Sequence, residues 1–245
     1  MNPRVTLATT RRILQQLRRD PRTIALLLVL PTALTAVLRY VFDDDQAVFT
    51  RVGPLMLGIF PLATMFVVTS VATLRERTGG TLERLMTTPL AKLDLLLGYA
   101  LAFSVAAVAQ IAVLLPVSLL LLGLEVEGPL WALVLVAVLV AVLGVALGLL
   151  GSAFARTEFQ AVQMFPALIL PQVLLCGLFA PRDSMGPVLG LLSDLMPLSY
   201  AVDALRALAV EPGFGSGQAV DTAVIAGVAL AALLVGAATL PRRTG

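Results

Sequence analysis

Residues 130 to 154 read LWALVLVAVLVAVLGVALGLLGSAF, a stretch of 25 residues without a charged side chain. A bilayer is crossed by an α-helix of about 20 apolar residues, because its hydrocarbon core is about 30 Å thick. Comparable stretches recur along the chain, which has 245 residues, 59% of them hydrophobic and only 13% charged. Soluble domains carry about 25% charged residues. The sequence therefore predicts an all-α polytopic membrane protein.

Six apolar stretches are long enough to span the bilayer. The third is longer than one crossing requires, so we expect it to tilt or to extend beyond the membrane surface. Prolines inside several spans are compatible with kinked membrane helices. On the fourth span, we expect Gly144, Gly148 and Gly151 to allow close packing of a neighbouring helix. The predicted spans are 24–40, 54–74, 93–122, 130–154, 160–180 and 222–240.

The basic residues predict the orientation, because Lys and Arg concentrate in cytoplasmic loops. Thirteen of the 17 precede the first span, follow the second or fourth, or lie in the tail, whereas ten of the 15 acidic residues lie in the other loops. We therefore expect both termini in the cytoplasm. The Arg-rich, Lys-poor composition is typical of a GC-rich bacterial genome, which predicts a bacterial plasma membrane. The predicted organisation is an interfacial segment (1–23), one transmembrane domain (24–240) and a cytoplasmic tail (241–245).

Several classes of chemistry lack their usual residues. The chain has no His and one Cys, and its predicted span interiors contain no Asp, Glu, Lys or Arg. Ion-coupled carriers usually keep an ionisable residue there, so this class is disfavoured, as is a lipid-modifying membrane enzyme. No G-x-x-x-x-G-K-S/T phosphate loop is present, and we predict no catalytic, cofactor or metal residues. The polar span residues, which could line a substrate path or join helices, are Thr64, Thr69, Ser70, Ser104, Gln110, Gln163 and Gln172.

The first 23 residues predict an interfacial helix at the cytoplasmic surface. Leu7, Leu14 and Leu17 repeat at helical spacing, and arginines occupy much of the remaining face. Such a helix can lie on a bilayer with its guanidinium groups near anionic phosphates. Pro21 should end it just before the first span.

Residues 75 to 90, RERTGGTLERLMTTPL, interrupt the apolar chain with charges and two glycines. The spacing of Leu82, Leu85 and Met86 predicts a short helix with one apolar side. The glycine pair should end the preceding helix, and Pro89 should end the short one. The predicted product is a rigid amphipathic element within the cytoplasmic segment 75–92, suited to docking.

This segment resembles the cytoplasmic loop of type-2 ABC transporter permeases, which reads approximately E-x-G-T-L-E-x-L-x-x-T-P in the branch of daunorubicin-resistance-like drug exporters. Thr78 and Gly79 depart from it, since many members carry charge there. The resemblance implies that the segment is a coupling helix, with apolar contact from the leucines and register set by the charges. The implied docking residues are Arg75, Glu76, Arg77, Gly80, Thr81, Leu82, Glu83, Arg84, Leu85, Met86, Thr88 and Pro89.

The loop 181–221 also resembles this family, whose members place an extracellular helical hairpin before the last span, often with the run P-L-x-Y-x-x-D-x-x-R. We expect Gly190 and Pro197 to divide the loop into short helices dipping into the outer leaflet. Asp203 and Arg206 are three residues apart and could pair on one helix face. The matching residues are Pro197, Leu198, Tyr200, Asp203 and Arg206.

The resemblance implies the membrane subunit of an ATP-driven exporter. Two six-span subunits, identical or paralogous, would pair in the lipid bilayer, and separate ATP-binding subunits would hold ATP and Mg; no nucleic acid is implied. The expected substrate is an amphiphilic drug, a secondary metabolite or a lipid, because the spans offer apolar surface and few polar groups. The alternatives are an exporter of lipid-linked or polysaccharide substrates and, less favoured, an ion-coupled carrier. The sequence does not identify the substrate.

Overall fold

The computed structural model describes residues 3–43, 45–79 and 92–239, and all regular elements within these ranges are helices. Six helical stretches in the described ranges are long and apolar enough to cross a membrane, which confirms the predicted number of spans. Their apolar segments are Pro21–Val41, Val48–Thr78, Asp94–Leu121, Leu130–Phe154, Glu158–Leu175 and Ser216–Ala238.

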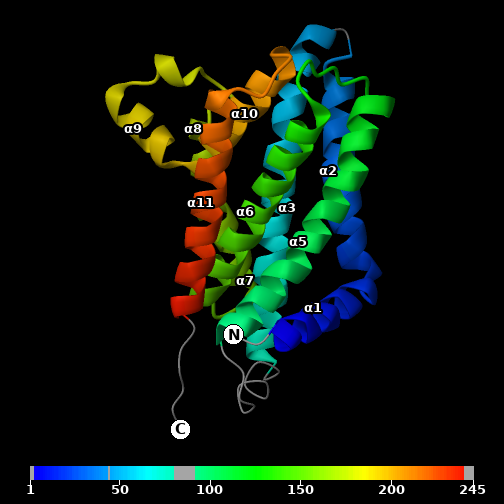
Figure 1. Ribbon diagram of the computed structural model, residues 1–245, viewed down its shortest axis with the longest axis vertical. Helices are drawn as coiled ribbons and strands as arrows, with labels where there is room; N and C mark the ends of the chain where they lie inside the picture. The colour runs from blue at the N-terminus through cyan, green and yellow to red at the C-terminus, as the bar shows by residue number, and fades with distance from the viewer. Residues whose placement is uncertain (1–2, 44, 80–91, 240–245) are drawn as a thin grey trace.

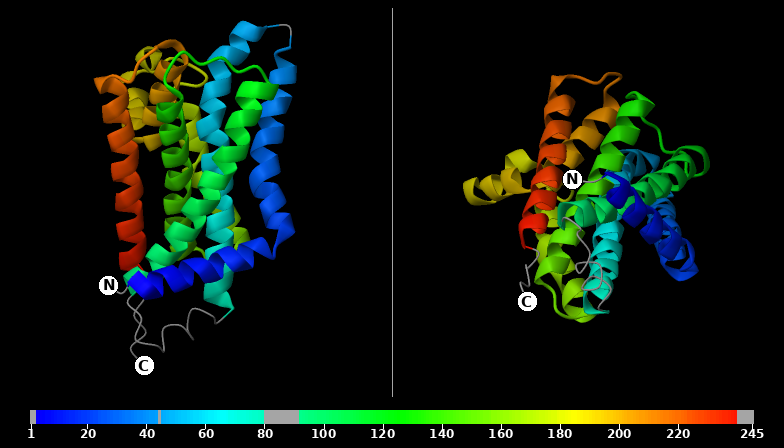
Figure 2. Two further views of the ribbon diagram at one scale, coloured as in Figure 1. Left: turned by 45° about the vertical axis from the view of Figure 1, so that its right-hand side comes forward. Right: turned by 60° about the horizontal axis from the view of Figure 1, so that its bottom comes forward.

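The long helices pack side by side, and the short helices lie at the two ends of the bundle (Figures 1 and 2). Helix α1 (Pro3–Arg18) lies across one end, near the last turn of α11 (Ser216–Thr239), and we call this the α1 end. Helix α10 (Pro197–Val210) lies at the opposite end, which we call the α10 end. Helix α2 (Pro21–Val41) leads from the first end to the second.

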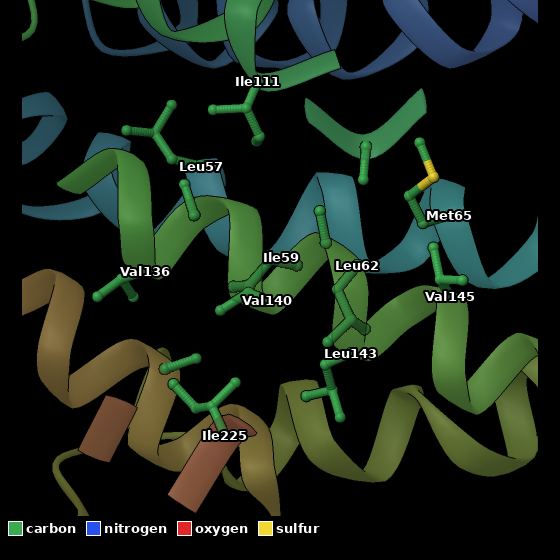
Figure 3. Packing of buried hydrophobic residues seen from close by; sticks show 14 of the residues in the cluster. Leu57, Ile59, Leu62, Met65, Ile111, Val136, Val140, Leu143, Val145 and Ile225 are labelled. Atoms are coloured by element: carbon green, nitrogen blue, oxygen red, sulfur yellow. The ribbon is translucent and has the colours of Figure 1, made fainter. Parts of the chain in front are cut away.

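The centre of the bundle is the contact between α3 (Gln46–Thr78) and α6 (Leu130–Phe154). Leu62 of α3 and Leu143 of α6 are fully buried there (Figure 3). A Cβ atom on Gly148 would lie 2.6 Å from the carbonyl oxygen of Phe66, so the two backbones touch where α6 has glycine. Contacts with α3 confirm the close packing predicted for Gly144, Gly148 and Gly151.

The predicted third span consists of α5 (Lys92–Pro116) and a π-helical turn, Val117–Leu121. Pro116 has no backbone N–H to donate, and a π-helical turn is one way in which a helix accommodates such a break. In Figure 1, α5 runs obliquely across α3 and α6, as expected for a span that is longer than one crossing.

The predicted fifth span is not one helix. It consists of α7 (Glu158–Leu168) and α8 (Leu170–Leu175), which meet at Ile169. Pro171 lies in the first turn of α8, where its missing N–H costs nothing. The span ends at Leu175 rather than at residue 180, because Gly177 adopts a φ of +88° that turns the chain away.

The predicted hairpin consists of α9 (Pro187–Leu195) and α10, which are bent by 86° relative to each other. Pro197 begins α10, but Gly190 lies inside α9, so its predicted break is wrong. Leu198, Val202 and Leu205 are fully buried, and α10 packs against α3, α6 and α11. Helix α10 therefore closes the α10 end of the core, whereas the predicted dipping of the short helices into the outer leaflet stays a prediction.

Helix α1 packs against α5 through small polar side chains, while Leu14 and Leu17 pack against the edge of the apolar core. Leu7 is 63% exposed, and its predicted contact with the bilayer surface stays a prediction. Gly98 of α5 permits the contact, since a Cβ atom there would lie 2.6 Å from the Cβ of Thr9. The hydroxyl of Thr10 donates to the Gly98 carbonyl at 3.1 Å. The buried residues of α1 are Thr6, Thr9, Thr10 and Ile13.

Candidate functional site at the α1 end

The predicted docking segment begins on the last turn of α3. This helix continues to Thr78, and the N–H of Gly79 donates to the Arg75 carbonyl at 2.9 Å, which confirms that the helix ends at the glycine pair. The described part of the predicted site is therefore Arg75, Glu76 and Arg77. The other predicted docking residues, which lie outside the described ranges, are Gly80, Thr81, Leu82, Glu83, Arg84, Leu85, Met86, Thr88 and Pro89.

The carboxylate of Glu76 joins three helices. Its Oε2 accepts from Nη2 of Arg12 on α1 at 3.0 Å and from the hydroxyl of Tyr99 on α5 at 2.8 Å. Its Oε1 accepts from Nε2 of Gln16 on α1 at 2.9 Å. The Glu76 side chain is only 14% exposed, and charge-assisted hydrogen bonds are strong where water is largely excluded. Glu76 therefore fixes the end of α3 to α1 and α5.

The two arginines beside Glu76 reach α6 and α7. Nε and Nη2 of Arg75 donate to the two carboxylate oxygens of Glu158 at 2.8 and 2.9 Å, a bidentate pair. Glu158 is the first residue of α7, where a negative charge also favours the helix dipole. Arg77 donates to the carbonyl of Ser152, which belongs to the last turn of α6 and has no helical donor of its own.

These contacts concentrate on one helical turn. Three consecutive side chains, Arg75, Glu76 and Arg77, connect α3 to α1, α5, α6 and α7. The side chains of Arg75 and Glu158 are both more than half exposed, so water screens the attraction between them. The hydrogen bonds of Glu76 are less exposed to water, so they stabilise the attachment of α3 to its neighbours more than the Arg75–Glu158 pair does. The arrangement is suited to transmitting a displacement and contains no catalytic constellation in the part that the structure describes.

The sequence did not reveal the partners of these three residues. The arginines of the first 23 residues, Arg12 among them, were predicted to mark orientation and to lie near lipid phosphates, and nothing in the sequence paired Arg75 with Glu158. The sequence analysis gave Tyr99 no role. A tyrosine just inside an apolar span, near a charged loop, nevertheless indicates that its hydroxyl forms a hydrogen bond at the end of the span. The docking roles of Arg75, Glu76 and Arg77 stay predictions, and the structure adds that each side chain has a partner within the chain.

The hairpin residues gather around Arg182, which the sequence analysis did not select. Its guanidinium donates to Asp194 on α9 and to Asp203 on α10, and it lies 5.5 Å from the centroid of the Tyr200 ring. The hydroxyl of Tyr200 donates to the Asp194 carbonyl at 2.8 Å. Arg182 therefore sets the angle between α9 and α10.

The predicted pairing of Asp203 with Arg206 is wrong. Asp203 binds Arg182, and Nη2 of Arg206 donates to the Gly177 carbonyl at 2.9 Å. Both side chains reach elements outside α10, because its inner side is filled by apolar residues such as Leu198. The motif residues thus hold the hairpin against the end of the fifth span.

Gln110 supplies the interhelical hydrogen bonds expected of at least some polar span residues. Its Nε2 donates to the Leu27 carbonyl on α2 at 2.8 Å and to the Thr64 hydroxyl on α3 at 2.6 Å. The Leu27 carbonyl lacks a helical donor because the residue four positions later is Pro31. Gln110 is fully buried, so it satisfies a carbonyl that would otherwise be unpaired in the apolar core.

Together, the six apolar helical stretches and the charged junction at their α1 end define a polytopic membrane protein whose helices are joined at one end by ion pairs and hydrogen bonds. The family model described as "ABC-2 type transporter" matches residues 4–210, and the chain belongs to this family. This membership confirms the resemblance to type-2 ABC permeases.

Individual relatives match a shorter part of the chain. ABC transporter G family member 20 of Dictyostelium discoideum is 27% identical over 154 residues, which is 63% of this chain and 21% of that protein. Probable multidrug ABC transporter permease YbhS of Escherichia coli (strain K12) is 29% identical over 143 residues, 58% of this chain and 38% of that protein. Probable multidrug ABC transporter permease YbhR of the same strain is 26% identical over 155 residues, 63% of this chain and 42% of that protein. The matches thus span less than half of each relative's length.

Proposed function

We propose that this chain is the membrane subunit of an ATP-driven exporter in a bacterial plasma membrane. Both termini face the cytoplasm, so the α1 end is the cytoplasmic end. Two such subunits, identical or paralogous, pair in the membrane, and two separate ATP-binding subunits hold ATP and Mg. The substrate is an amphiphilic drug, a secondary metabolite or a lipid-like molecule. The names of YbhS and YbhR, each a probable multidrug permease, support a multidrug-type exporter.

The observation that carries this proposal is the anchoring of the last turn of α3. Segment 80–91 connects that turn to α5, and we assign to it the surface that the ATP-binding subunit contacts. Because Glu76 is bonded to α1 and α5, and its two neighbours to α6 and α7, a push on the segment reaches four other helices. A loop that only joined α3 to α5 would not need the last turn of α3 to be bonded to four other helices.

The energy source is assigned to the partner because this chain has no phosphate-loop sequence. The contribution of this chain to transport is the movement of its spans around a substrate path. Glu83 and Arg84 set the register of docking, while Leu82 and Leu85 supply the apolar contact. This division of roles makes docking and membrane insertion separable by mutation.

The test is a charge reversal in the docking segment. Glu83→Arg is co-expressed with a candidate ATP-binding subunit that co-purifies with the wild-type chain, and Glu125→Arg, an exposed charge reversal at the α10 end, is the matched control. We expect Glu83→Arg to insert normally, to lose co-purification of the ATP-binding subunit and to abolish drug efflux from cells. The control should retain all three properties.

Full efflux and normal co-purification by Glu83→Arg would refute the docking assignment. Efflux that survives ATP depletion but stops when the ion gradient is collapsed would refute the ATP-driven class in favour of a carrier. These two results are distinguishable, because the first concerns the segment and the second concerns the energy source.

A further inference from the structure

A cavity of about 430 Å³ lies at the α1 end, between the elbow that joins α1 to α2 and the facing sides of α3 and α5. Pockets for small ligands range from about 300 to 1,000 Å³, so the volume suits the head and upper chain of an amphiphile. The cavity lies beside the Glu76 junction but is not needed for it. Nothing in the proposed export mechanism uses this space.

One wall of the cavity is apolar. Val67, Val68 and Val71 form it on α3, with Phe103 opposite on α5 and Leu26 on α2. The valines are half-buried and Leu26 is 58% exposed, so the wall continues onto the lipid-facing surface of α2. An apolar chain lying along this wall would replace lipid contacts without leaving the hydrocarbon region.

The rim of the cavity presents opposite charges from two different elements. Asp20 comes from the elbow between α1 and α2, and Arg75 comes from α3. They form no salt bridge with each other, although Arg75 acts electrostatically on Asp20. Hydrogen bonds from the side chain and backbone of Thr23 lower the pKa of Asp20, so its carboxylate stays ionised.

Both charged groups have unused hydrogen-bonding capacity. The two oxygens of Asp20 accept from Thr23, at 3.1 and 2.7 Å, and from the backbone N–H of Arg22, whereas a carboxylate accepts about four hydrogen bonds. Arg75 directs Nε and Nη2 toward Glu158, which leaves further guanidinium hydrogens available. Glu76, by contrast, already accepts from three donors. The rim therefore offers one acceptor for a cation and one donor for an anion.

We propose that this cavity binds a zwitterionic amphiphile, with its ammonium group at Asp20, its phosphate at Arg75 and an apolar chain along the valine wall. Phosphatidylethanolamine is the membrane lipid of this chemistry. A purely anionic head would leave Asp20 unmatched, and a purely cationic head would leave Arg75 unmatched. The proposal concerns binding alone and does not depend on the export function.

The test uses the purified full chain in a non-ionic detergent and counts bound lipids by native mass spectrometry. Phosphatidylethanolamine is titrated against phosphatidylglycerol with the same acyl chains and against chain-free glycerophosphoethanolamine. Three variants are compared: Asp20→Asn, which removes the charge but keeps a good helix N-cap; Val68→Trp, which fills the cavity; and Val29→Trp, which adds the same ring on the lipid-facing side of α2, where Val29 is 60% exposed. The thermal midpoint of each variant is measured first.

We expect one phosphatidylethanolamine to bind more tightly than phosphatidylglycerol and the chain-free head not to compete. Asp20→Asn should weaken phosphatidylethanolamine about fivefold and leave phosphatidylglycerol unchanged, as for loss of one exposed charge contact. Val68→Trp should abolish the site, and Val29→Trp should not. Equal binding of both lipids, or wild-type binding by Val68→Trp with an unchanged thermal midpoint, would overturn the proposal. Tighter binding of dodecyltrimethylammonium than of phosphatidylethanolamine would overturn the role of Arg75.

Discussion

The contact between α3 and α6 makes a quantitative prediction for Gly148→Ala. The new Cβ would lie 2.6 Å from the Phe66 carbonyl oxygen, whereas ordinary contact begins near 3.4 Å, so the helices must separate by about 0.8 Å. Overpacking of this kind costs about 2 kcal/mol. Alanine returns about 1 kcal/mol of helix propensity. The net loss of about 1 kcal/mol lowers the thermal midpoint by about 2–4 °C in a chain of this size.

Gly227→Ala is the matched control, because it makes the same chemical change in α11 at an exposed position with nothing within 4 Å of the new atom. At this position alanine increases helix propensity without causing a clash, so the thermal midpoint should rise by up to about 2–4 °C. Both variants are purified in detergent, and their thermal unfolding is followed by circular dichroism. A midpoint for Gly148→Ala that equals or exceeds the wild-type value would refute the close approach of α3 and α6.

Further changes test the other helix contacts, by the same unfolding assay for Gln110 and Gly98 and by limited proteolysis for Arg182. Gln110→Leu should cost about 1–2 kcal/mol, because each interhelical hydrogen bond in a membrane contributes about 0.6 kcal/mol and the Leu27 carbonyl is left unpaired. Pro31→Ala restores a donor for that carbonyl, so a double-mutant cycle should show a smaller cost of Gln110→Leu in this background; equal costs would contradict the assignment. Arg182→Gln leaves the carboxylates of Asp194 and Asp203 without their cation and should increase proteolytic cleavage between α9 and α10. Resistance to cleavage equal to that of the wild type would rule out the bridging role of Arg182. Gly98→Ala should displace α1 and lower the midpoint by about 2–4 °C, and an unchanged midpoint would argue against the α1–α5 contact.

The number and positions of the spans were predictable because a bilayer imposes one simple requirement on each of them. The fourth span matches α6 at both ends, since flanking prolines and charges mark where the apolar run stops. The effect of internal prolines was not predictable in the same way. Pro31 and Pro61 lie inside continuous helices, whereas Pro171 begins a new one. Neighbouring helices decide between a kink and a break, and periodicity carries no information about those neighbours.

The candidate site was predictable as a segment but not as a set of contacts. Charge, glycines and a recognisable pattern located it at the end of α3. The partners of Glu76 come from positions far away in the chain, such as Arg12 and Tyr99, so their meeting depends on how three helices pack. The contact between α1 and α5 was not predictable for a related reason: threonines opposite Gly98 can bury themselves against a backbone, which hydrophobic periodicity does not register.

The interruption at Ile169 has a consequence for movement within the bundle. Helix α7 packs against α3, while α8 packs against α9 and α10, so the two halves of the fifth span belong to different neighbours. A continuous helix would act as a stiff lever and carry any rotation at one membrane face directly to the other. With a joint at mid-depth, the halves can turn about different axes. In the proposed exporter, the half of the fifth span beside α3 could therefore move without displacing the hairpin.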